Sequence, residues 1–168
     1  MVTSSFCSRR LPVADMMTMT DQPIVPERLQ AKLCNEAAGA LVAFEGWIRN
    51  ENEGQQVLRL EYEAYDPLCV SEGRRVIEEA LQTFPLLQAQ CVHRTGLLEL
   101  GECAVWVGVT SAHRDAAFAA CRFIIDLVKV RLPIWKKEHY VNGDSGWVNC
   151  ERCAAHATHT TDGKLVSN

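Results

Sequence analysis

The ten residues "KVRLPIWKKE", at positions 129–138, carry the densest positive charge in the sequence. Their cations are Lys129, Arg131, Lys136 and Lys137. A guanidinium binds a phosphate or carboxylate as a planar fork, and an ammonium binds it as a point charge. Since the formal net charge of the chain is -4, bulk electrostatics do not favour a nucleic-acid or membrane-surface partner. The segment therefore predicts a local site for a small anion.

Lys129 lies near the end of a predicted helix, on the border of its apolar face. A lysine in this position usually extends its amine into solvent. If the amine is instead desolvated beside Arg131 and Lys136, its neutral form could act as a base or a nucleophile. Trp135 could be a stacking surface or part of the core, and the core is the favoured interpretation. The segment alone leaves these alternatives open.

The motif "SAHRDAAF" begins the same predicted helix. His113 and Arg114 fall in its first turn, where free N–H groups and the helix dipole favour an anion. Two basic residues there indicate either an anion site or an ordinary surface pair. Fifteen residues separate Arg114 from Lys129, which is about 22 Å along a helix. One small ligand can hardly touch both ends, so a site that uses all three residues requires two copies of the chain.

Arg49 lies at a predicted strand end beside the polar loop "NENEG". Loops at the ends of rigid strands are common places for ligand contacts. A lone arginine there is nevertheless more often simply solvated, and its contribution to an anion site stays a hypothesis.

The C-terminal segment "CERCAAHATH" has the residue types of a zinc site, namely Cys150, Cys153, His156 and His159. The H-x-x-H spacing is shorter than usual, and no second pair elsewhere matches it. We therefore favour an incidental tail that bears Cys and His, and we predict neither a metal site nor a cofactor.

Length and composition predict one compact domain with modest tails. The chain has 168 residues, 48% of them hydrophobic, which is enough for a core. We expect a disordered leader at residues 1–25, the functional domain at 26–150 and a flexible tail at 151–168. No apolar run approaches the roughly 18 residues of a membrane span, which indicates a soluble chain.

Eight cysteines could indicate disulfides. Cys34, Cys91, Cys103 and Cys121 lie inside apolar periodic segments of a chain too large to depend on disulfides. Reduced, buried thiols are the better interpretation, and they predict a cytoplasmic setting.

Hydrophobic periodicity alternates helices with pairs of strands. Helices are predicted from Pro26 to Gly39, over 66–84 and over 112–131, the last capped by Ser111, stopped by Pro133 and packed through Phe118, Cys121, Ile125 and Val128. Strand pairs are predicted at 39–49 with 56–65, where Leu58, Leu60, Tyr62 and Ala64 share a face, at 88–96 with 103–111, and in a hairpin after Pro133. Strands that arrive in hairpin pairs favour an α+β fold with a mostly antiparallel sheet.

Several motifs together are similar to one known family. They are "GWIRNENEG", "LEYEAY", "VHRTGLLELGE", "SAHRDAAFAA" and "LVKVRLPIWKKE" with a following "GWV". In this order and spacing they resemble the MoaE family, the catalytic (large) subunit of molybdopterin synthase, from about Pro26 to Val148. The resemblance implies an α/β hammerhead-type fold with an added antiparallel subdomain.

The resemblance also implies a reaction and partners. Members of the family are sulfurtransferases that convert cyclic pyranopterin monophosphate, or precursor Z, to molybdopterin in molybdenum cofactor biosynthesis. The sulfur donor is the thiocarboxylate at the C-terminal Gly-Gly of a small ubiquitin-like subunit of the MoaD type. Two large subunits form a central homodimer, and a small subunit at each end completes a heterotetramer.

The family's site residues carry over to Arg49, His113, Arg114, Lys129, Lys136, Lys137 and Glu138. By this resemblance Arg49, His113 and Arg114 would anchor anionic oxygens of the substrate. Lys129 would be the main catalytic residue, as an acid or base or through a covalent link to the partner's tail. Lys136 would stabilise developing negative charge and bind the carboxylate end of that tail. After "GWV" the family often has a further basic residue, whereas this chain has "NCERC".

Two other classes of function stay open from the residues alone. The same basic pocket could belong to a non-catalytic module that holds a phosphorylated ligand or a partner's acidic tail. The Cys and His residues of the tail could belong to a zinc-binding interaction module.

Overall fold

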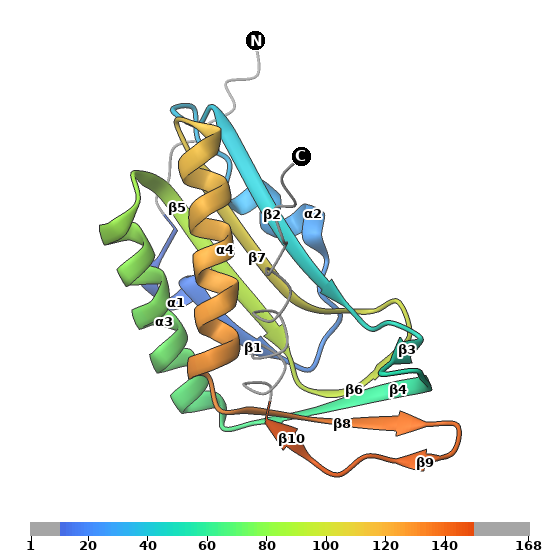
Figure 1. Ribbon diagram of the computed structural model, residues 1–168. Coiled ribbons are helices and arrows are strands. Elements are labelled where there is room, and N and C mark those ends of the chain that lie inside the picture. Colours follow the sequence, from blue (N-terminus) through green and yellow to red (C-terminus); the bar gives the residue numbers. More distant parts are fainter. Residues whose placement is uncertain (1–10, 150–168) are drawn as a thin grey trace, which may run out of the picture.

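The computed structural model describes residues 11–149 and shows an α+β domain with two sheets (Figure 1). Its helices are α1 (Val13–Met16), α2 (Pro26–Lys32), α3 (Asp66–Thr83) and α4 (Arg114–Arg131). The strands of the first sheet are β1 (Met17–Thr20), β2 (Ala40–Trp47), β5 (Leu86–Arg94) and β7 (Cys103–Ser111). Those of the second are β3 (Glu51–Asn52), β4 (Gln55–Ala64), β6 (Gly96–Glu99), β8 (Ile134–Tyr140), β9 (Gly143–Asp144) and β10 (Val148–Asn149).

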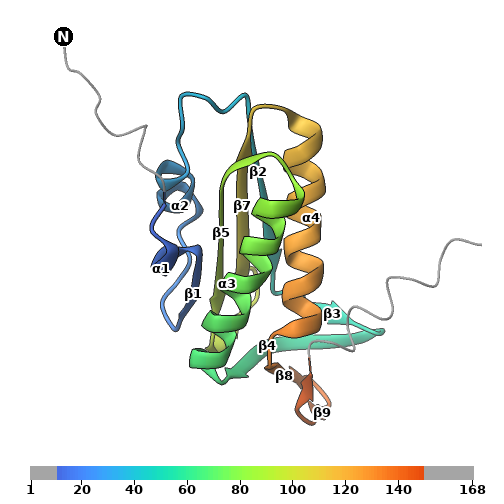
Figure 2. The ribbon, with the colours of Figure 1, turned by 90° about the vertical axis from the view of Figure 1, so that its left-hand side faces the viewer.

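The first sheet has the strand order β1-β5-β7-β2 and forms the centre of the domain. β5 and β2 both run antiparallel to β7, and β1 runs parallel to β5. The helices α3 and α4 cover one face, and α2 lies on the other (Figure 2). Because β5 and β7 are covered on both faces, their residues are buried almost continuously rather than in alternation, and in β5 the buried residues include polar ones such as Gln88 and Gln90.

Gly108 on β7 marks the tightest packing on the α2 side of this sheet. A Cβ at this position would overlap the Trp106 ring and lie 2.7 Å from Leu33 Cδ1. Both of those side chains are fully buried. Glycine therefore allows α2 to pack closely on the central strand.

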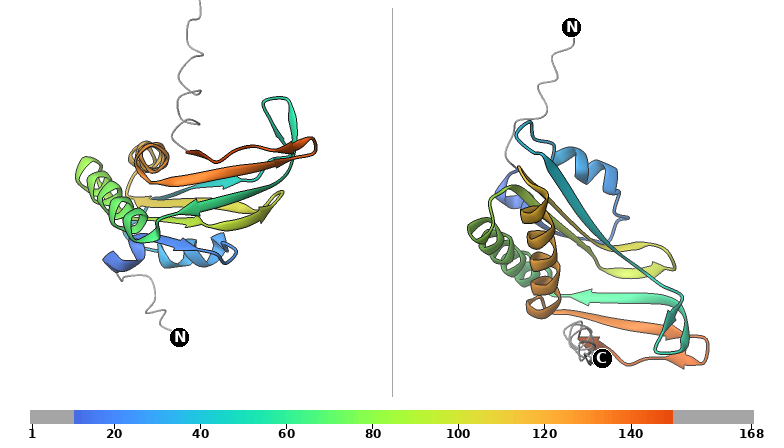
Figure 3. Two further views of the ribbon diagram at one scale, coloured as in Figure 1. Left: turned by 90° about the horizontal axis from the view of Figure 1, so that it is seen from below. Right: turned by 45° about the horizontal axis from the view of Figure 1, so that its top comes forward.

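The second sheet has the strand order β10-β8-β4-β3, with β6 paired to β4 and β9 paired to β8. Its long strands β4 and β8 run across one end of the first sheet, beside the last turn of α4 (Figure 3). Pro133 ends α4 at Arg131, as predicted, and β8 begins at Ile134. A small separate core lies beneath this sheet, formed by Ile48, Val57, Leu60, Leu98 and Ala104.

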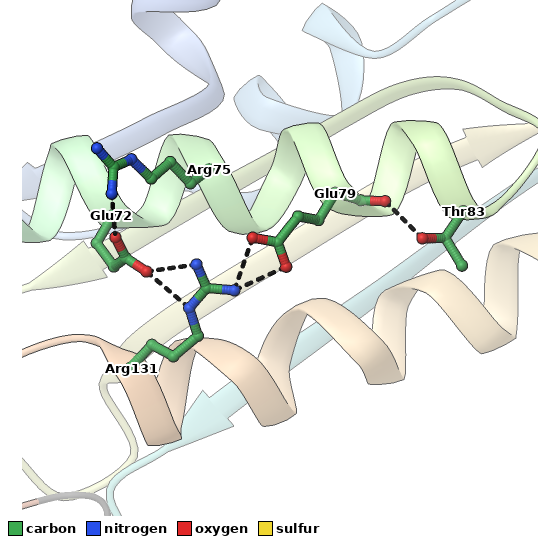
Figure 4. Close-up of polar contacts among 5 residues, drawn as sticks. All are labelled: Glu72, Arg75, Glu79, Thr83 and Arg131. Carbon is green, nitrogen blue, oxygen red and sulfur yellow. Dashed lines mark hydrogen bonds and ion pairs between the residues drawn. The ribbon is translucent and has the colours of Figure 1, made fainter.

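Arg131 fastens the last turn of α4 to α3 (Figure 4). Its Nε donates to Glu72 at 2.6 Å, and one terminal nitrogen donates to both carboxylate oxygens of Glu79 at 2.8 and 2.7 Å. The hydrogen bonds to Glu79 and Glu72 raise the pKa of Arg131 and outweigh its partial burial. The end of α4 is thus held between the core and a charged fork.

Several predictions about the N-terminal half are wrong. The helix from Pro26 ends at Lys32 rather than at Gly39. The strands predicted at 39–49 and 56–65 do not pair: β2 joins β7, and β4 joins β8 and β6. Leu58 is 51% exposed because a bulge between Val57 and Arg59 shifts the alternation of β4.

The predicted disordered leader is wrong for the part of it that the structure describes. Residues Val13–Met16 form α1, and β1 follows directly and pairs with β5. Leu11, Met16 and Met17 belong to the main core. The tail residues Cys150, Cys153, His156 and His159 lie outside the described residues.

Two expectations for α4 also require correction. Phe118 is 62% exposed, whereas Cys121, Ile125 and Val128 are buried as predicted. Ser111 ends β7 and does not cap the helix: its Oγ donates to the carbonyl of Pro85 at 2.8 Å, and His113 is the N-cap.

The cysteines agree only partly with the expectation of free thiols. Cys69, Cys91, Cys103 and Cys121 are free, and burial raises the pKa of the Cys121 thiol to about 11. Cys34 is disulfide-bonded, so a reduced thiol is the wrong assignment there. Across residues 11–149 no helix has the length and hydropathy of a membrane span.

Candidate active site

A cavity of about 1150 Å³ lies where the two sheets meet the last turns of α4. Residues from β2, β4, β5, β8, α4 and the loop after β2 line it. Its charged and polar lining includes Arg49, Asn52, His93, Lys129, Lys136 and Glu138. The cavity therefore collects cations from three separate parts of the chain.

Lys129 reaches the cavity from the last turns of α4, beside Ile125 and Val128. It is half-buried, and its Nζ lies 6.0 Å from the centroid of the Phe44 ring on β2. An ammonium at this distance from an aromatic face is attracted to it electrostatically. The amine thus lies at the edge of the core and is open to the cavity.

Lys136 enters the cavity from β8, on the same face as Glu138 and Tyr140. Its Nζ donates to Glu138 Oε1 at 2.7 Å, and the two side chains are only 17% and 6% exposed. In this half-buried position the Glu138 carboxylate balances the charge of the ammonium. Lys129 on α4 and Lys136 on β8 thus reach one cavity from two elements, which Pro133 separates.

Glu138 is the centre of the polar network in the cavity. Its Oε2 accepts from Asn52 Nδ2 at 2.9 Å and from the hydroxyl of Tyr140, while Oε1 accepts from Lys136. Burial alone would raise the pKa of this carboxyl, but its three donors together hold it below its usual value. Burial and the neighbouring carboxylate raise the pKa of Tyr140, so the phenol stays protonated and donates. Glu138 is consequently an ionised partner of Lys136 and not a proton donor.

His93 on β5 is a cavity residue that the sequence analysis did not single out. Its Nδ1 lies 2.8 Å from the carbonyl of Arg94, and since a carbonyl can only accept, the ring proton is on Nδ1. The ring also meets Tyr62 edge to face at 5.2 Å. Burial, and secondarily the charge of Lys129, lower the pKa of His93 to about 4. The ring is therefore neutral beside the lysine at neutral pH.

Three predicted site residues lie elsewhere in this protomer. His113 and Arg114 begin α4 at its far end, and the Arg114 side chain is 82% exposed beside Asp115. Lys137 lies on the opposite face of β8 from Lys136, because successive strand residues alternate. None of the three is among the described residues that line the cavity.

Neighbours of the basic segment also differ from expectation. Arg131 is engaged by Glu72 and Glu79 on α3 and does not line the cavity within the described part of the chain. Trp135 is 38% exposed, so assigning it to the core was wrong. Because side chains alternate along β8, Trp135 and Lys137 both lie on the face that points away from the cavity. The same alternation from Lys136 would have predicted Tyr140.

The known proteins that match the chain belong to one family. A family profile described as "MoaE protein" matches residues 19–131, most of the chain. The chain belongs to the MoaE family. The match extends from within β1 to the last residue of α4, so it includes Arg49 and Lys129 but ends before β8.

Relatives from distant organisms support membership in the MoaE family. A protein of Thermoplasma volcanium named molybdopterin synthase catalytic subunit is 42% identical over 77% of this chain and 94% of its own length. Proteins of the same name from Pseudomonas aeruginosa and Homo sapiens are 42% and 34% identical, over 73% and 83% of this chain and 81% and 73% of their own lengths.

Solved structures of the MoaE family share the fold. The crystal structure of molybdopterin synthase from Staphylococcus aureus has a TM-score of 0.74 at 31% identity and covers 83% of this chain and 98% of its own. A MoaE protein from Burkholderia ambifaria has a TM-score of 0.70 at 28% identity, over 84% of this chain and 97% of its own. The mostly antiparallel α+β architecture predicted from the hairpin pairs is thereby confirmed.

Proposed function

We propose that this chain is the catalytic subunit of a molybdopterin synthase, a sulfurtransferase of molybdenum cofactor biosynthesis. The observation that carries the proposal is the meeting of Lys129 and Lys136 in one cavity of a MoaE-family fold. The substrate is cyclic pyranopterin monophosphate, whose phosphate needs fixed cations. The sulfur donor is the C-terminal thiocarboxylate of a small ubiquitin-like subunit.

The side chains that line the cavity divide the work of sulfur transfer. Each transfer forms a C–S bond at a carbon of the pterin side chain while a C–O bond of that carbon breaks, and the oxygen leaves as water or with the phosphate. Water cleaves the acyl–sulfur bond to the partner, which leaves an ordinary carboxylate on its tail. Lys129 carries protons for these steps, from the edge of the apolar core. Lys136, held by Glu138, stabilises the negative charge that develops on the acyl oxygen. Arg49 at the cavity mouth binds an anionic group of the substrate.

Substrate binding is shared between two copies of the chain in this proposal. His113 and Arg114 lie about 22 Å from Lys129 along α4, so they complete the cavity of the other protomer. Lys137, on the opposite face of β8, belongs to the same shared arrangement. The assembly is a central homodimer of this chain with one small subunit at each end, in the cytoplasm.

The Lys129→Ala variant tests the proposed catalytic residue. With precursor Z and thiocarboxylated small subunit, we expect sulfur insertion to fall by on the order of a thousandfold, the usual scale for loss of a catalytic acid or base. The matched control is Lys32→Ala, which removes an exposed lysine at the end of α2. Activity of Lys129→Ala at the rate of the control would contradict the assignment.

A non-catalytic binding module is distinguished by the same pair of variants. In a binding module, wild type and the Lys32→Ala control would both bind the small subunit and a pterin phosphate, but neither would show turnover. The catalytic proposal predicts turnover in both, and binding of the small subunit by Lys129→Ala without turnover.

A further inference from the structure

Asn52 occupies the point where the two charged groups of the cavity meet. Its Oδ1 accepts from a terminal nitrogen of Arg49 at 2.6 Å, and its Nδ2 donates to Glu138 Oε2 at 2.9 Å. Glu138 in turn holds Lys136 at 2.7 Å. A single amide therefore joins the exposed arginine at the cavity mouth to the buried lysine–glutamate pair.

The orientation of this amide is determined by the chemistry of its neighbours. A guanidinium can only donate hydrogen bonds, so it must face the amide oxygen. An ionised carboxylate can only accept, so it must face the amide nitrogen. Exchanging the two ends would place donor against donor and acceptor against acceptor. A carboxylate or an aliphatic side chain in place of Asn52 cannot satisfy both partners at neutral pH.

The backbone that carries Asn52 is itself rigidly placed. Asn52 pairs with Gln55 across a two-residue turn formed by Glu53 and Gly54. Both turn residues have positive φ, 51° and 76°, which is the geometry of the tight turns that match the twist of a hairpin. The side chain thus projects toward Glu138 from a short hairpin and not from a flexible loop.

We propose that Asn52 is a positioning residue that couples Arg49 to the Glu138–Lys136 pair. The inference rests on the proposed function, for which it supplies a missing part. Arg49 is exposed and would otherwise sample many rotamers, at a cost in entropy each time it bound an anion. Held by Asn52, it keeps its remaining N–H groups directed at the substrate, while the same amide keeps Glu138 aligned on Lys136.

The Asn52→Asp variant tests this role through the pH dependence of the reaction. At neutral pH the new carboxylate faces Glu138, and we expect kcat to fall by on the order of tenfold or more. Glu138 raises the pKa of the introduced acid, whereas the guanidinium of Arg49 and the ammonium of Lys136 lower it. As the pH is lowered it becomes protonated, and its hydroxyl can then donate to Glu138 as the amide did. We therefore expect the activity of Asn52→Asp, relative to wild type, to recover on acidification.

Two further variants separate positioning from simpler effects. Asn52→Ala removes the hydrogen bonds to Arg49, Glu138 and Tyr140, so its activity should be low at every pH without recovery. Asn50→Asp introduces the same charge on an exposed residue just before the hairpin, and it should keep kcat and KM within about twofold of wild type. A pH profile of Asn52→Asp parallel to that of wild type, or full activity of Asn52→Ala, would overturn the proposal.

A readout without turnover keeps this inference distinct from the proposed function. The side-chain amide protons of Asn52, observed by NMR in the intact protein, should exchange with solvent more slowly than those of Asn50. Equal, fast exchange would reject the coupling even in an active enzyme. Slow exchange in a protein that transfers no sulfur would instead reject the proposed function and keep the hydrogen-bonded geometry.

Discussion

At the residue scale, the cavity places a neutral imidazole, His93, beside the charged amine of Lys129. His93 contributes a ring fixed by the Arg94 carbonyl and by the edge of Tyr62. Because burial keeps this ring uncharged, it adds no repulsion to Lys129. Protonating it would place two cations side by side in a region shielded from water. The imidazole is thus a source of acid sensitivity built into the cavity wall.

Acidification should destabilise the fold through His93. Its pKa of about 4 lies below the usual 6.5, so between these values the unfolded chain binds the proton more readily than the folded chain. Stability from the neutral ring is complete above pH 6.5 and is lost as the pH falls toward 4. Between pH 7 and pH 5 the loss should be about 2 kcal/mol of unfolding free energy.

Urea unfolding at both pH values, in wild type and His93→Asn, measures this contribution. Asparagine retains a donor toward the Arg94 carbonyl but does not titrate. We expect a lower stability at pH 7 and a shallower dependence on pH in the variant. Identical slopes in the two proteins would show that His93 is not the acid-sensitive group.

At the scale of elements, the sequence predicted what depends on local pattern and missed what depends on partners. The strand pair β5 and β7 and the Pro133 boundary were predicted correctly. The pairing of β2 was not, because hydrogen-bonding partners far apart in the sequence leave no local signal. β1 was missed for a similar reason: its four residues gain their order from contact with β5.

The residues of the candidate site also fall into those that local pattern could predict and those that depend on partners. Lys129 and Lys136 could be proposed from charge and helix geometry, and the structure brings them together. Asn52 and His93 could not, since their roles come from Glu138 and from the Arg94 carbonyl. Asn52 meets Glu138 only through strand pairing, since β3 and β8 both pair with β4. His93 has its carbonyl partner next to it in the chain, but only the fold places its ring in the cavity wall.

Packing between elements yields a sharp test at Gly108. We expect Gly108→Ala to lower the unfolding free energy by about 1–3 kcal/mol, because the added methyl must displace the buried Trp106 and Leu33. The matched control is Gly146→Ala, where no atom lies within 4 Å of the added carbon. Thermal unfolding of both variants checks the difference. Equal stability of the two would mean that α2 yields to the extra methyl.

At the scale of the whole molecule, the length of α4 determines how a complete site can form. Lys129 lines the cavity at one end, while His113 and Arg114 stand at the other. If the proposed dimer supplies the missing residues, each cavity draws on both chains. A C2 dimer built this way has two equivalent composite sites.

Mixed dimers should regain activity lost in their parents. Lys129→Ala and the double variant His113→Ala/Arg114→Ala damage opposite contributions to the composite site. Random co-assembly makes half of the dimers mixed, each with one intact site, so about one quarter of wild-type activity should return. Sulfur insertion by the co-refolded pair measures this recovery. No activity above the sum of the parents would place all the residues in one protomer's cavity.

The two-residue joint between α4 and β8, Leu132 and Pro133, has a consequence for how the chain can vary in length. One added residue there would turn β8 over, so that Trp135 and Lys137 faced the cavity and Lys136 and Glu138 faced away. The seven-residue spacing from Lys129 to Lys136 is therefore a fixed dimension of the site, as constrained as the identity of the lysines themselves.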